Sequence, residues 1–287
     1  MTRPESRSQR AIRDKMDRYV RKHAPDIPGW LANESAQVIS HLAMTQIQGG
    51  ITGGVGEIGI HHGKLFLLLY LSLQEGERAF ALDVFEEQQL NVDGSGRGDR
   101  SAFLRNFVRI GGDRERLTVF AMDSCSVSAD DLRTKTGPLR LMSIDGGHTE
   151  DITHNDMGLA EDLLLDEGIL VLDDVYSERW PAVAAGAFRF VLEPGRRLRP
   201  FAISPNKTYF CKSPDAAAHY RKALGANCRE LRVSRATVFG SEVLILGKRT
   251  FVNRIRNHPV VENNPRLYQS LSRVRAMMRP SGRSSTR

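Results

Sequence analysis

Acidic side chains follow two short apolar runs of this sequence, and a histidine lies close behind the first of them. The first run ends at Asp145, with His148 three positions further on, and the second ends at the pair Asp173 and Asp174. Carboxylate oxygens are the ligands that a hard cation such as Mg²⁺ prefers, and histidine is the side chain that most often serves as a general base. The residue types therefore indicate a cation-binding site with a base beside it.

Each apolar run has the length and composition of a buried strand, which predicts that these acids meet at one edge of a sheet. In an open α/β sheet, ligands bind at the carboxyl ends of the parallel strands. Three ionised carboxylates in one place repel one another, and a divalent cation removes that conflict. We therefore predict Asp145, Asp173 and Asp174 as metal ligands and His148 as the base. The alternatives are solvated or salt-bridged acids and a loop histidine without a role.

A segment containing glycines follows the first predicted strand. Gly59 and Gly63 would let the backbone approach a ligand closely, and the helix that follows offers its N-terminus to negative charge. A tight turn without a ligand is the alternative. Asp83 ends the next strand, 24 residues after Gly59. An acid at that place accepts hydrogen bonds from ribose hydroxyls in nucleoside-binding folds, and its alternative is a cap or loop carboxylate.

The third predicted strand ends in another acid and a hydroxyl. Asp123 and Ser124 are suitable partners for the edge of an adenine ring, and local capping is the alternative. Because they follow a parallel strand, we expect them at the same sheet edge as Asp83 and Asp145.

Strands and helices alternate from residue 50 onward, which is the pattern of βαβ units. We expect an α/β fold with a doubly wound, mostly parallel, seven-stranded sheet and N-terminal helices. The pair Pro205 and Asn206 predicts a tight turn and antiparallel pairing of the strands that flank it. The predicted strands are 55–60, 79–84, 117–122, 139–144, 168–172, 201–204, 208–212 and 231–248. The predicted helices are 7–23, 35–48, 62–73, 101–110 with Ser101 as its cap, a short one between 122 and 139, 155–165, 180–190, 215–224 and 264–278.

The composition is that of an ordinary globular protein. Of the 287 residues, 40% are hydrophobic and 26% are charged. The longest apolar stretch, 65–73, is too short to cross a bilayer, and the charged N-terminus lacks the apolar core of a signal peptide. Three cysteines without metal-like spacing indicate no disulfide framework. We therefore expect a cytoplasmic protein with reduced thiols and no membrane span.

Charge is distributed unevenly along the chain. Residues 1–23 carry eight basic and three acidic side chains, and residues 248–287 carry ten basic and one acidic, whereas the body between them is net acidic. Solvated helix faces and a frayed tail are one interpretation, and an anionic partner such as nucleic acid or a membrane surface is another. No aromatic residues interleave with the terminal arginines after Tyr268, which argues against nucleic acid.

Taken in order, these segments resemble the class I S-adenosylmethionine-dependent methyltransferases over about residues 50–250. The Asp-Gly-Gly-His segment at 145–148 and the acidic pair at 173–174 are similar to the metal-dependent macrolide sugar O-methyltransferases of the macrocin and mycinamicin type, and to the related cephalosporin hydroxylase-like group. The resemblance implies a Rossmann-like methyltransferase fold. It also implies S-adenosylmethionine and Mg²⁺, or another hard divalent cation, as cofactors.

The resemblance assigns roles residue by residue. The family's first glycine motif corresponds to Glu57 and Gly59, its ribose acid to Asp83 and its adenine-side acid to Asp123. Two histidines precede the glycine at position 63, and an aspartate opens the acidic pair where some relatives have glutamate. The implied cofactor-binding residues are Glu57, Gly59, Gly63, Asp83, Asp123, Ser124 and Asp145, the implied catalytic residues are His148 and Asp145, and the implied metal ligands are Asp145, Asp173 and Asp174.

The sequence thus predicts an O-methyltransferase that acts on a hydroxyl of a sugar or a related, glycosylated natural-product acceptor. The expected domains are an N-terminal helical extension over 1–49, a methyltransferase domain over 50–250, and a C-terminal helix with a basic tail over 251–287. The long polar loop over 86–100 is a candidate lid. Whether the chain forms a homo-oligomer stays open.

Two other functions remain as alternatives at this point. One is a metal-dependent glycosyltransferase, because Val-Leu-Asp-Asp-Val at 171–175 resembles the acidic strand end that holds the metal of a nucleotide sugar. That reading leaves the residues at 57–63 and Asp83 without coordinated roles. The other is a module that binds polyanions through the basic ends of the chain, in a strongly salt-dependent manner.

Overall fold

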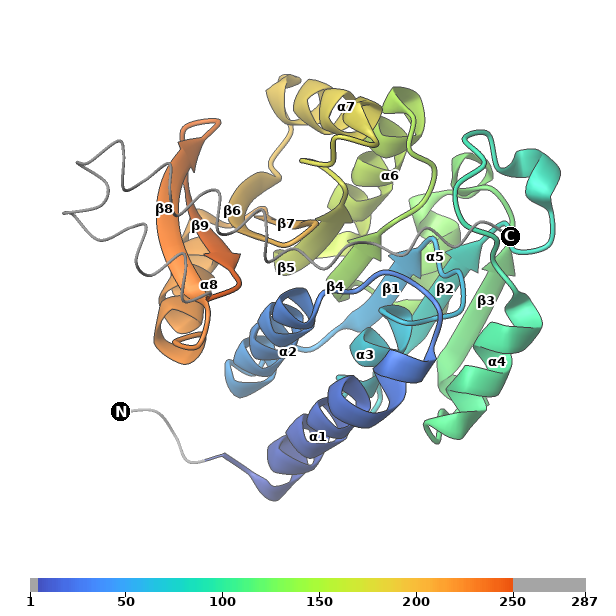
Figure 1. The fold of residues 1–287 in the computed structure, drawn as a ribbon, viewed down its shortest axis with the longest axis horizontal. Coiled ribbons are helices and arrows are strands. Elements are labelled where there is room, and N and C mark those ends of the chain that lie inside the picture. The colour runs from blue at the N-terminus through green and yellow to red at the C-terminus, as the bar shows by residue number, and fades with distance from the viewer. Residues whose placement is uncertain (1–4, 250–287) are drawn as a thin grey trace, which may run out of the picture.

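A nine-stranded mixed sheet forms the centre of the computed structural model, which describes residues 5–249. The helix predicted over 264–278 and the tail over 251–287 lie outside the described residues. The strands are β1 (Gly54–Ile58), β2 (Ala79–Asp83), β3 (Leu117–Ala121), β4 (Leu139–Ile144), β5 (Leu164–Asp173), β6 (Arg199–Ser204), β7 (Lys207–Cys211), β8 (Arg232–Val238) and β9 (Ser241–Gly247). Their order across the sheet is β3-β2-β1-β4-β5-β7-β6-β9-β8 (Figure 1).

The first five strands are parallel, and the strand order reverses within them. The chain runs outward from β1 through β2 to β3 and then returns to β4 on the other side of β1. In open α/β sheets such a reversal leaves a crevice outside the carboxyl ends of the two strands between which it occurs. The end of β1 and the end of β4 therefore border the place where a ligand is expected.

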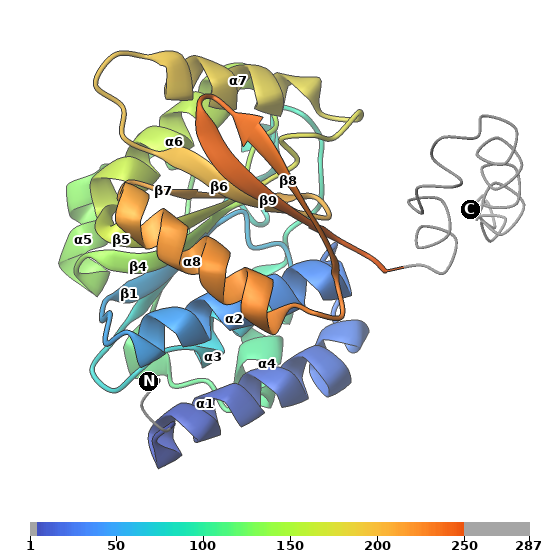
Figure 2. The same ribbon diagram turned by 90° about the vertical axis from the view of Figure 1, so that its left-hand side faces the viewer.

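Helices cover both faces of the sheet, which confirms the doubly wound arrangement (Figures 1 and 2). One apolar cluster joins the sheet to the first four helices and the last, and it includes Met16, Leu42 and Phe103. A second cluster, with Met157 and Phe190, joins the opposite face to the other three. No helix in the described part of the chain is both long and apolar enough to cross a membrane. The helices are α1 (Arg7–Arg18), α2 (Asn33–Gln48), α3 (Phe66–Leu71), α4 (Arg100–Arg109), α5 (Ala129–Thr136), α6 (Glu150–Leu163), α7 (Pro181–Leu192) and α8 (Pro214–Asn227).

The predicted tight turn after β6 is confirmed. Asn206 adopts a positive φ of 65°, and β6 and β7 pair antiparallel with Ser204 opposite Lys207. β7 in turn pairs antiparallel with β5, and Asp173 is the direct partner of Lys207 in that register. The turn therefore places a lysine beside the acidic end of β5.

The sheet has nine strands rather than the seven predicted. Eight segments of the chain were predicted as strands, and one of them, 231–248, contributes two strands rather than one. Phe239 and Gly240 have φ values of 51° and 72°. Two consecutive residues with positive φ are typical of the turn that closes a two-residue hairpin. β8 and β9 accordingly pair antiparallel, with Val238 opposite Ser241, and extend the sheet beyond β6.

The starts of α3, α4 and α6 differ from the prediction for identifiable reasons. Asp99, not Ser101, caps α4, because its side chain accepts a hydrogen bond from the first turn at 2.7 Å. Thr149 caps α6 in the same manner, so that helix begins well before the predicted residue 155. α3 is shorter than predicted because Gly63, with φ of 88°, belongs to a turn that precedes it.

Candidate active site

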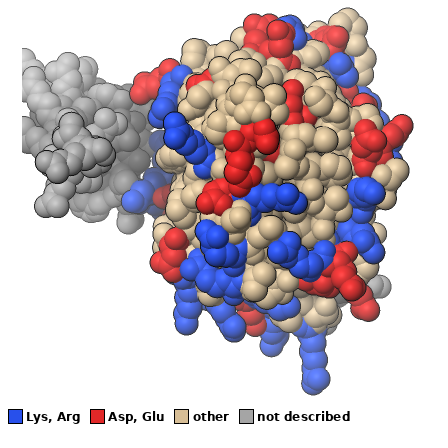
Figure 3. Space-filling model, turned by 90° about the vertical axis from the view of Figure 1, so that its right-hand side faces the viewer, with Lys and Arg blue, Asp and Glu red and all other residues tan. Residues whose placement is uncertain are grey.

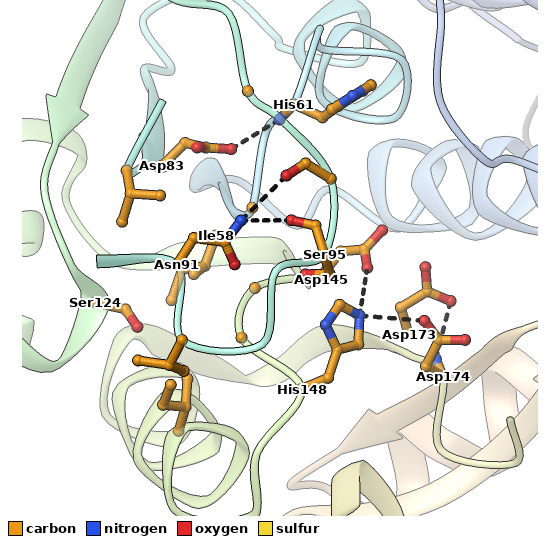
Figure 4. Close-up of a pocket in the computed structure, with 18 of the residues that line it drawn as sticks. Ile58, His61, Asp83, Asn91, Ser95, Ser124, Asp145, His148, Asp173 and Asp174 are labelled. Atoms are coloured by element: carbon orange, nitrogen blue, oxygen red, sulfur yellow. Dashed lines mark hydrogen bonds and ion pairs between the residues drawn. The ribbon is translucent and has the colours of Figure 1, made fainter. Parts of the chain in front are cut away.

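A cavity of about 330 Å³ lies at the carboxyl ends of β1, β2, β4 and β5 (Figure 4). The strand ends and the loops after them supply most of its wall, as expected for a doubly wound sheet. Of the residues predicted from the sequence, those that line it are Gly59, Asp83, Asp123, Ser124, Asp145, His148, Asp173 and Asp174.

Gly59 brings the end of β1 against the segment that follows β4. It has φ of 85°, and a Cβ atom built on it would lie 1.9 Å from the carbonyl oxygen of Asp145. The backbone N–H of Asp145 donates to the carbonyl of Ile58 at 2.8 Å. Any side chain at position 59 would therefore separate the two strand ends, so this glycine is required by packing as well as by its backbone conformation.

Asp83 holds the loop after β1 through its carboxylate. One oxygen accepts hydrogen bonds from the backbone N–H groups of Ile60 at 2.6 Å and His61 at 2.8 Å, and the other accepts from Phe85 at 2.6 Å. A carboxylate has about four acceptor positions. Asp83 thus acts in part as a loop carboxylate, which was the alternative to a ligand-binding role. Its side chain also lines the cavity and can accept a further hydrogen bond there.

Two predicted cofactor residues lie outside the cavity wall. Glu57 is 2% exposed and stands opposite Ser143 in the β1–β4 pairing. Burial raises the pKa of its carboxyl well above the ordinary value. A Cβ atom at Gly63 would lie 2.6 Å from the ring of Phe103 in α4, so this glycine lets the two segments pack closely.

Ser124 and Asp123 line the part of the cavity that follows β3. Asp123 accepts a hydrogen bond from the backbone of Cys125 at 3.1 Å, which is local capping, and Ser124 is 5% exposed. Asp156 of α6 is fully buried nearby, and its Oδ2 atom has no hydrogen-bond partner among the described residues. Burial raises the pKa of Asp156 to about 7. A charged Asp156 therefore costs folding free energy.

Asp156→Asn is expected to stabilise the protein in a pH-dependent way. Between the ordinary pKa of 3.8 and the folded value of about 7, the folded state binds the proton more tightly, so the cost of the carboxylate grows as pH rises and is complete above that window. The neutral amide should raise the free energy of unfolding by roughly 2–4 kcal/mol at pH 8, with little gain near pH 4. Urea unfolding at the two pH values measures this, and an equal gain at both would contradict the assignment.

Asp145, His148 and Asp174 converge on one part of the cavity wall. Nε2 of His148 lies 3.4 Å from Oδ2 of Asp174 and 3.9 Å from Oδ1 of Asp145. One ligand atom from each of the three lies within 4.8 Å of the others, and Figure 4 shows the imidazole pointing toward both carboxylates. We call these residues the Asp145–His148–Asp174 group. It has the donor types that bind a divalent cation.

The charges within this group support one another. Burial by itself lowers the pKa of His148, but hydrogen bonds with Asp174 and Asp93 raise it above the ordinary value. Burial likewise opposes ionisation of Asp174, but hydrogen bonds with His148 and Asn206 lower its pKa. Asp174 therefore presents an ionised carboxylate to the cavity at neutral pH.

Asp173, the third predicted metal ligand, is engaged by Lys207 instead of joining this group. The ammonium of Lys207 donates to Oδ2 of Asp173 and lies 3.5 Å from Oδ2 of Asp145. The amide of Asn206 donates to Oδ1 of Asp173 at 2.8 Å. The side chains of Asp173 and Lys207 are 4% and 2% exposed. The salt-bridge alternative is thus the one that the structure supports for this acid.

The pKa values of the two partners shift in directions that favour different protonation states. Burial and the Asp145 carboxylate raise the pKa of Asp173. Burial lowers the pKa of Lys207, but the carboxylates of Asp173 and Asp145 raise it to a net value above the ordinary one. We treat Asp173 as ionised, because the Lys207 ammonium and the Asn206 amide both donate to its carboxylate and a protonated acid would leave the buried ammonium with a weaker partner.

Three neighbours of this group were not predicted from the sequence. Asp93 lies 3.0 Å from Nδ1 of His148, and the Trp180 ring stacks on the imidazole with centroids 4.2 Å apart and planes at 22°. Lys207 is the third. Asp93 falls in the predicted lid loop, but no spacing marks it there. Lys207 could have been predicted as a neighbour of Asp173 only if the register of β5 against β7 had been known.

Comparisons with known proteins agree with this architecture. Residues 57–175 match a family model described as a methyltransferase domain. The structure superposes on the O-methyltransferase NovP with a TM-score of 0.57 at 11% identity, covering 71% of this chain and 99% of NovP. No curated protein sequence matches the chain.

Two further solved structures are similar at lower TM-scores. An O-methyltransferase from Bacillus cereus in complex with SAH gives 0.47 at 16% identity, covering 73% of this chain and 93% of that one. MycE, a methyltransferase from the mycinamycin biosynthetic pathway in complex with Mg, SAH and mycinamycin VI, gives 0.46 at 16% identity, covering 73% of this chain and 55% of MycE.

The domain match spans the end of β1, the end of β2, the segment after β4 and the acidic end of β5, which are the segments that build the cavity. It favours a methyltransferase over the glycosyltransferase alternative. Residues 57–175 therefore form a methyltransferase domain by this match, and the fold around them is the Rossmann-like fold of the class I methyltransferases.

Proposed function

We propose that this methyltransferase acts on a hydroxyl group of a sugar or a related natural-product acceptor, with a divalent cation beside the reacting oxygen. The observation that carries the proposal is the Asp145–His148–Asp174 group, which shares one cavity with Gly59 and Asp83. If the cofactor binds along the ends of β1 and β2, the acceptor would bind next to it, at the Asp145–His148–Asp174 group. The resemblance of the fold to the O-methyltransferase NovP is consistent with transfer to oxygen.

The donors present fit a hard cation. Asp145 and Asp174 offer carboxylate oxygens to the cavity, and the charge of the cluster stays negative after Lys207 has offset one of its three acids. Mg²⁺ prefers such oxygens, so we assign Asp145 and Asp174 as its protein ligands. When bound, the cation would polarise the acceptor oxygen and lower the pKa of its hydroxyl. Asp173, which the sequence also suggested, would support the site through its ion pair with Lys207.

His148 would act as the general base of the reaction. Its Nε2 atom faces the two carboxylates that would hold the cation, and the stacked Trp180 ring limits rotation of the imidazole. The proton of the acceptor hydroxyl would pass to Nε2 while the oxygen attacks the methyl group of the sulfonium. Because the thioether leaves as a neutral group, the protein has mainly to align the two reactants and to stabilise the developing alkoxide.

The cofactor would be held by the ends of β1, β2 and β3. Asp83 keeps acceptor capacity for ribose hydroxyls, and Asp123 and Ser124 line the wall where an adenine edge would lie. Glu57 and Gly63 remain predicted cofactor residues whose contribution would be indirect, through the packing around β1. The site is therefore divided into a cofactor side and an acceptor side that meet at Asp145.

Apolar side chains at the rim of the cavity suit an acceptor with a large apolar body. Trp30, Leu90 and Val92 line the cavity and are 72%, 42% and 66% exposed. An exposed aromatic ring offers a face on which a sugar or another ring can pack. Acidic groups inside and apolar groups outside favour a glycosylated natural product over a small, fully polar sugar.

The basic segment at the N-terminal end does not lead to a competing function. On the face shown in Figure 3, lysines and arginines gather toward the lower edge, with some acidic side chains beside them. The N-terminal segment itself carries Glu5, Asp14 and Asp17 among its eight basic residues. A polyanion site requires a surface of one sign to gain affinity from released counterions. We therefore prefer the acceptor methylation proposal to a polyanion-binding module.

Removal of divalent metal tests the proposal. With S-adenosylmethionine and a panel of macrolide glycosides, excess EDTA is expected to lower turnover by about 10²-fold or more, and added Mg²⁺ should restore it. Binding of S-adenosylhomocysteine, measured by calorimetry, should be nearly the same with and without EDTA. Full turnover in EDTA would eliminate the cation, and methylation of amines but of no hydroxyl acceptor would overturn the choice of oxygen.

A further inference from the structure

The loop between β2 and α4 contacts the proposed base directly, although it lies far from it in sequence. Oδ2 of Asp93 accepts a hydrogen bond from the backbone N–H of His148 and lies 3.0 Å from Nδ1 of the same residue. The two side chains are 9% and 10% exposed, so the contact is shielded from water. The other oxygen of Asp93 accepts from the backbone of Ser95 at 2.7 Å.

The loop itself is built so that it presents Asp93 toward the cavity. The side-chain amide of Asn91 donates to the carbonyls of Ser95 at 2.7 Å and Gly96 at 3.1 Å, which closes a tight turn around position 93. The backbone of Asp99 donates to the carbonyl of His61 at 3.4 Å and ties the end of the loop to the segment after β1. The carboxylate of Asp93 is therefore held at a fixed place by the turn.

Three carboxylates surround the imidazole of His148, and they compete for its single proton in the neutral ring. Asp93 lies next to Nδ1, whereas Asp145 and Asp174 lie next to Nε2. A carboxylate can only accept, so whichever nitrogen donates fixes the tautomer. With the proton on Nδ1, the lone pair of Nε2 faces the cavity. With the proton on Nε2, it would be bonded to Asp174 and no base would face the acceptor.

We propose that Asp93 is a positioning residue, which holds the proton of neutral His148 on Nδ1 and so leaves Nε2 free to accept the proton of the acceptor hydroxyl. The geometry favours this tautomer, because the Nδ1 contact at 3.0 Å is shorter than the Nε2 contacts at 3.4 and 3.9 Å. Partner groups of this kind set the tautomer of histidines in other catalytic and metal sites. The kinetic consequence rests on the proposed function, whereas the tautomer itself does not.

The same contact joins the loop to the wall of the cavity. Leu90 and Val92 lie on this loop and line the cavity. Loss of the contact between Asp93 and His148 would therefore remove the acceptor that selects the tautomer and also a tie between this loop and the site.

The test compares Asp93→Ala, Asp93→Asn and Glu87→Gln in the full-length protein. Nitrogen-15 NMR of the histidine rings, without cofactor, metal or acceptor and at a pH high enough for His148 to be neutral, reads the tautomer of this histidine. The wild type is expected to carry the proton on Nδ1, and Asp93→Ala should move it to Nε2. Asp93→Asn should retain the Nδ1 tautomer, because an amide oxygen still accepts from Nδ1–H. Glu87→Gln removes a charge from the same loop without contacting His148 and should change nothing.

Steady-state kinetics then separate the positioning of His148 from the anchoring of the loop that carries Asp93. Asp93→Ala should lower kcat by about 10²-fold, with a smaller change in the KM for S-adenosylmethionine, and Asp93→Asn should recover most of the lost kcat. A His148 tautomer that is the same in wild type and Asp93→Ala would overturn the proposal. A His148→Gln variant with full activity would instead overturn the assignment of the base, while leaving the tautomer result intact.

Discussion

Asp145→Asn is expected to lower kcat for methyl transfer by about 10³-fold while leaving the affinity for S-adenosylhomocysteine within about threefold of wild type. One oxygen of Asp145 faces Nε2 of His148 and the other faces Lys207. The substitution keeps the shape of the side chain but removes one of the two charges that would hold the cation. The measurement is steady-state methylation of a glycoside with saturating Mg²⁺, together with calorimetric binding of S-adenosylhomocysteine.

Asp151→Asn is the matched control for this variant. The side chain of Asp151 is 88% exposed, and among the described residues its ion-pair partner is Arg189 on the surface. Its neutralisation should leave kcat within about twofold, because exposed ion pairs contribute little. If Asp145→Asn retained more than a tenth of the wild-type kcat, neither the proposed cation site nor the proposed alkoxide stabilisation would be tenable at this position.

Lys207→Met is expected to lower the free energy of unfolding by about 3–5 kcal/mol, the cost typical of breaking a buried ion pair from one side. The methionine fills most of the lysine volume, so the loss arises from charge. Asp173, which is 4% exposed, would lose its ammonium partner and lie near a second carboxylate, that of Asp145, which would also lose its contact with the ammonium. Urea unfolding followed by circular dichroism at neutral pH measures the change.

A double variant and a surface control make this result specific. Combining Lys207→Met with Asp173→Leu should recover most of the lost stability, because both buried charges then disappear together. Arg197→Met removes a positive charge from the ion pair with Asp166, in which both side chains are 53% exposed. This substitution should lower the free energy of unfolding by less than about 1 kcal/mol. Equal losses for Lys207→Met and Arg197→Met would refute the buried ion pair as a stabilising element.

Local rules of chain geometry account for the parts of the fold that were predicted correctly. The apolar runs before Asp83 and Asp145 became β2 and β4, because a short run of that kind can bury itself only as a central strand. The turn at Pro205 was found because proline and asparagine favour it wherever they occur together. Position 101 was misassigned as a cap because Asp99 competes for the same N–H groups, and only the path of the preceding loop decides between them.

The number of strands and the position of the hairpin depended on longer-range pairing. Residues 231–248 read as continuous strand because Phe239 does not signal a turn, yet it adopts a positive φ of 51° before Gly240. Such a conformation is uncommon for an aromatic residue and is held by the pairing of β8 with β9. Residue preferences therefore could not predict a turn at Phe239, because phenylalanine disfavours the conformation that the turn requires.

The sequence by itself determined that acids would stand at the ends of parallel strands with a histidine nearby, because apolar runs fix the strands and parallel strands deliver their carboxyl ends to one edge. Only the tertiary structure decided how those acids are used. Asp173 and Asp174 are adjacent, but Asp173 ends the strand opposite Lys207, and Asp174 turns away with φ of 59° toward His148. That division follows from the register of β5 against β7. The tautomer proposed for His148 follows from Asp93, which lies 55 residues away in the sequence. Both contacts join distant segments of the chain, so local residue spacing cannot reveal them.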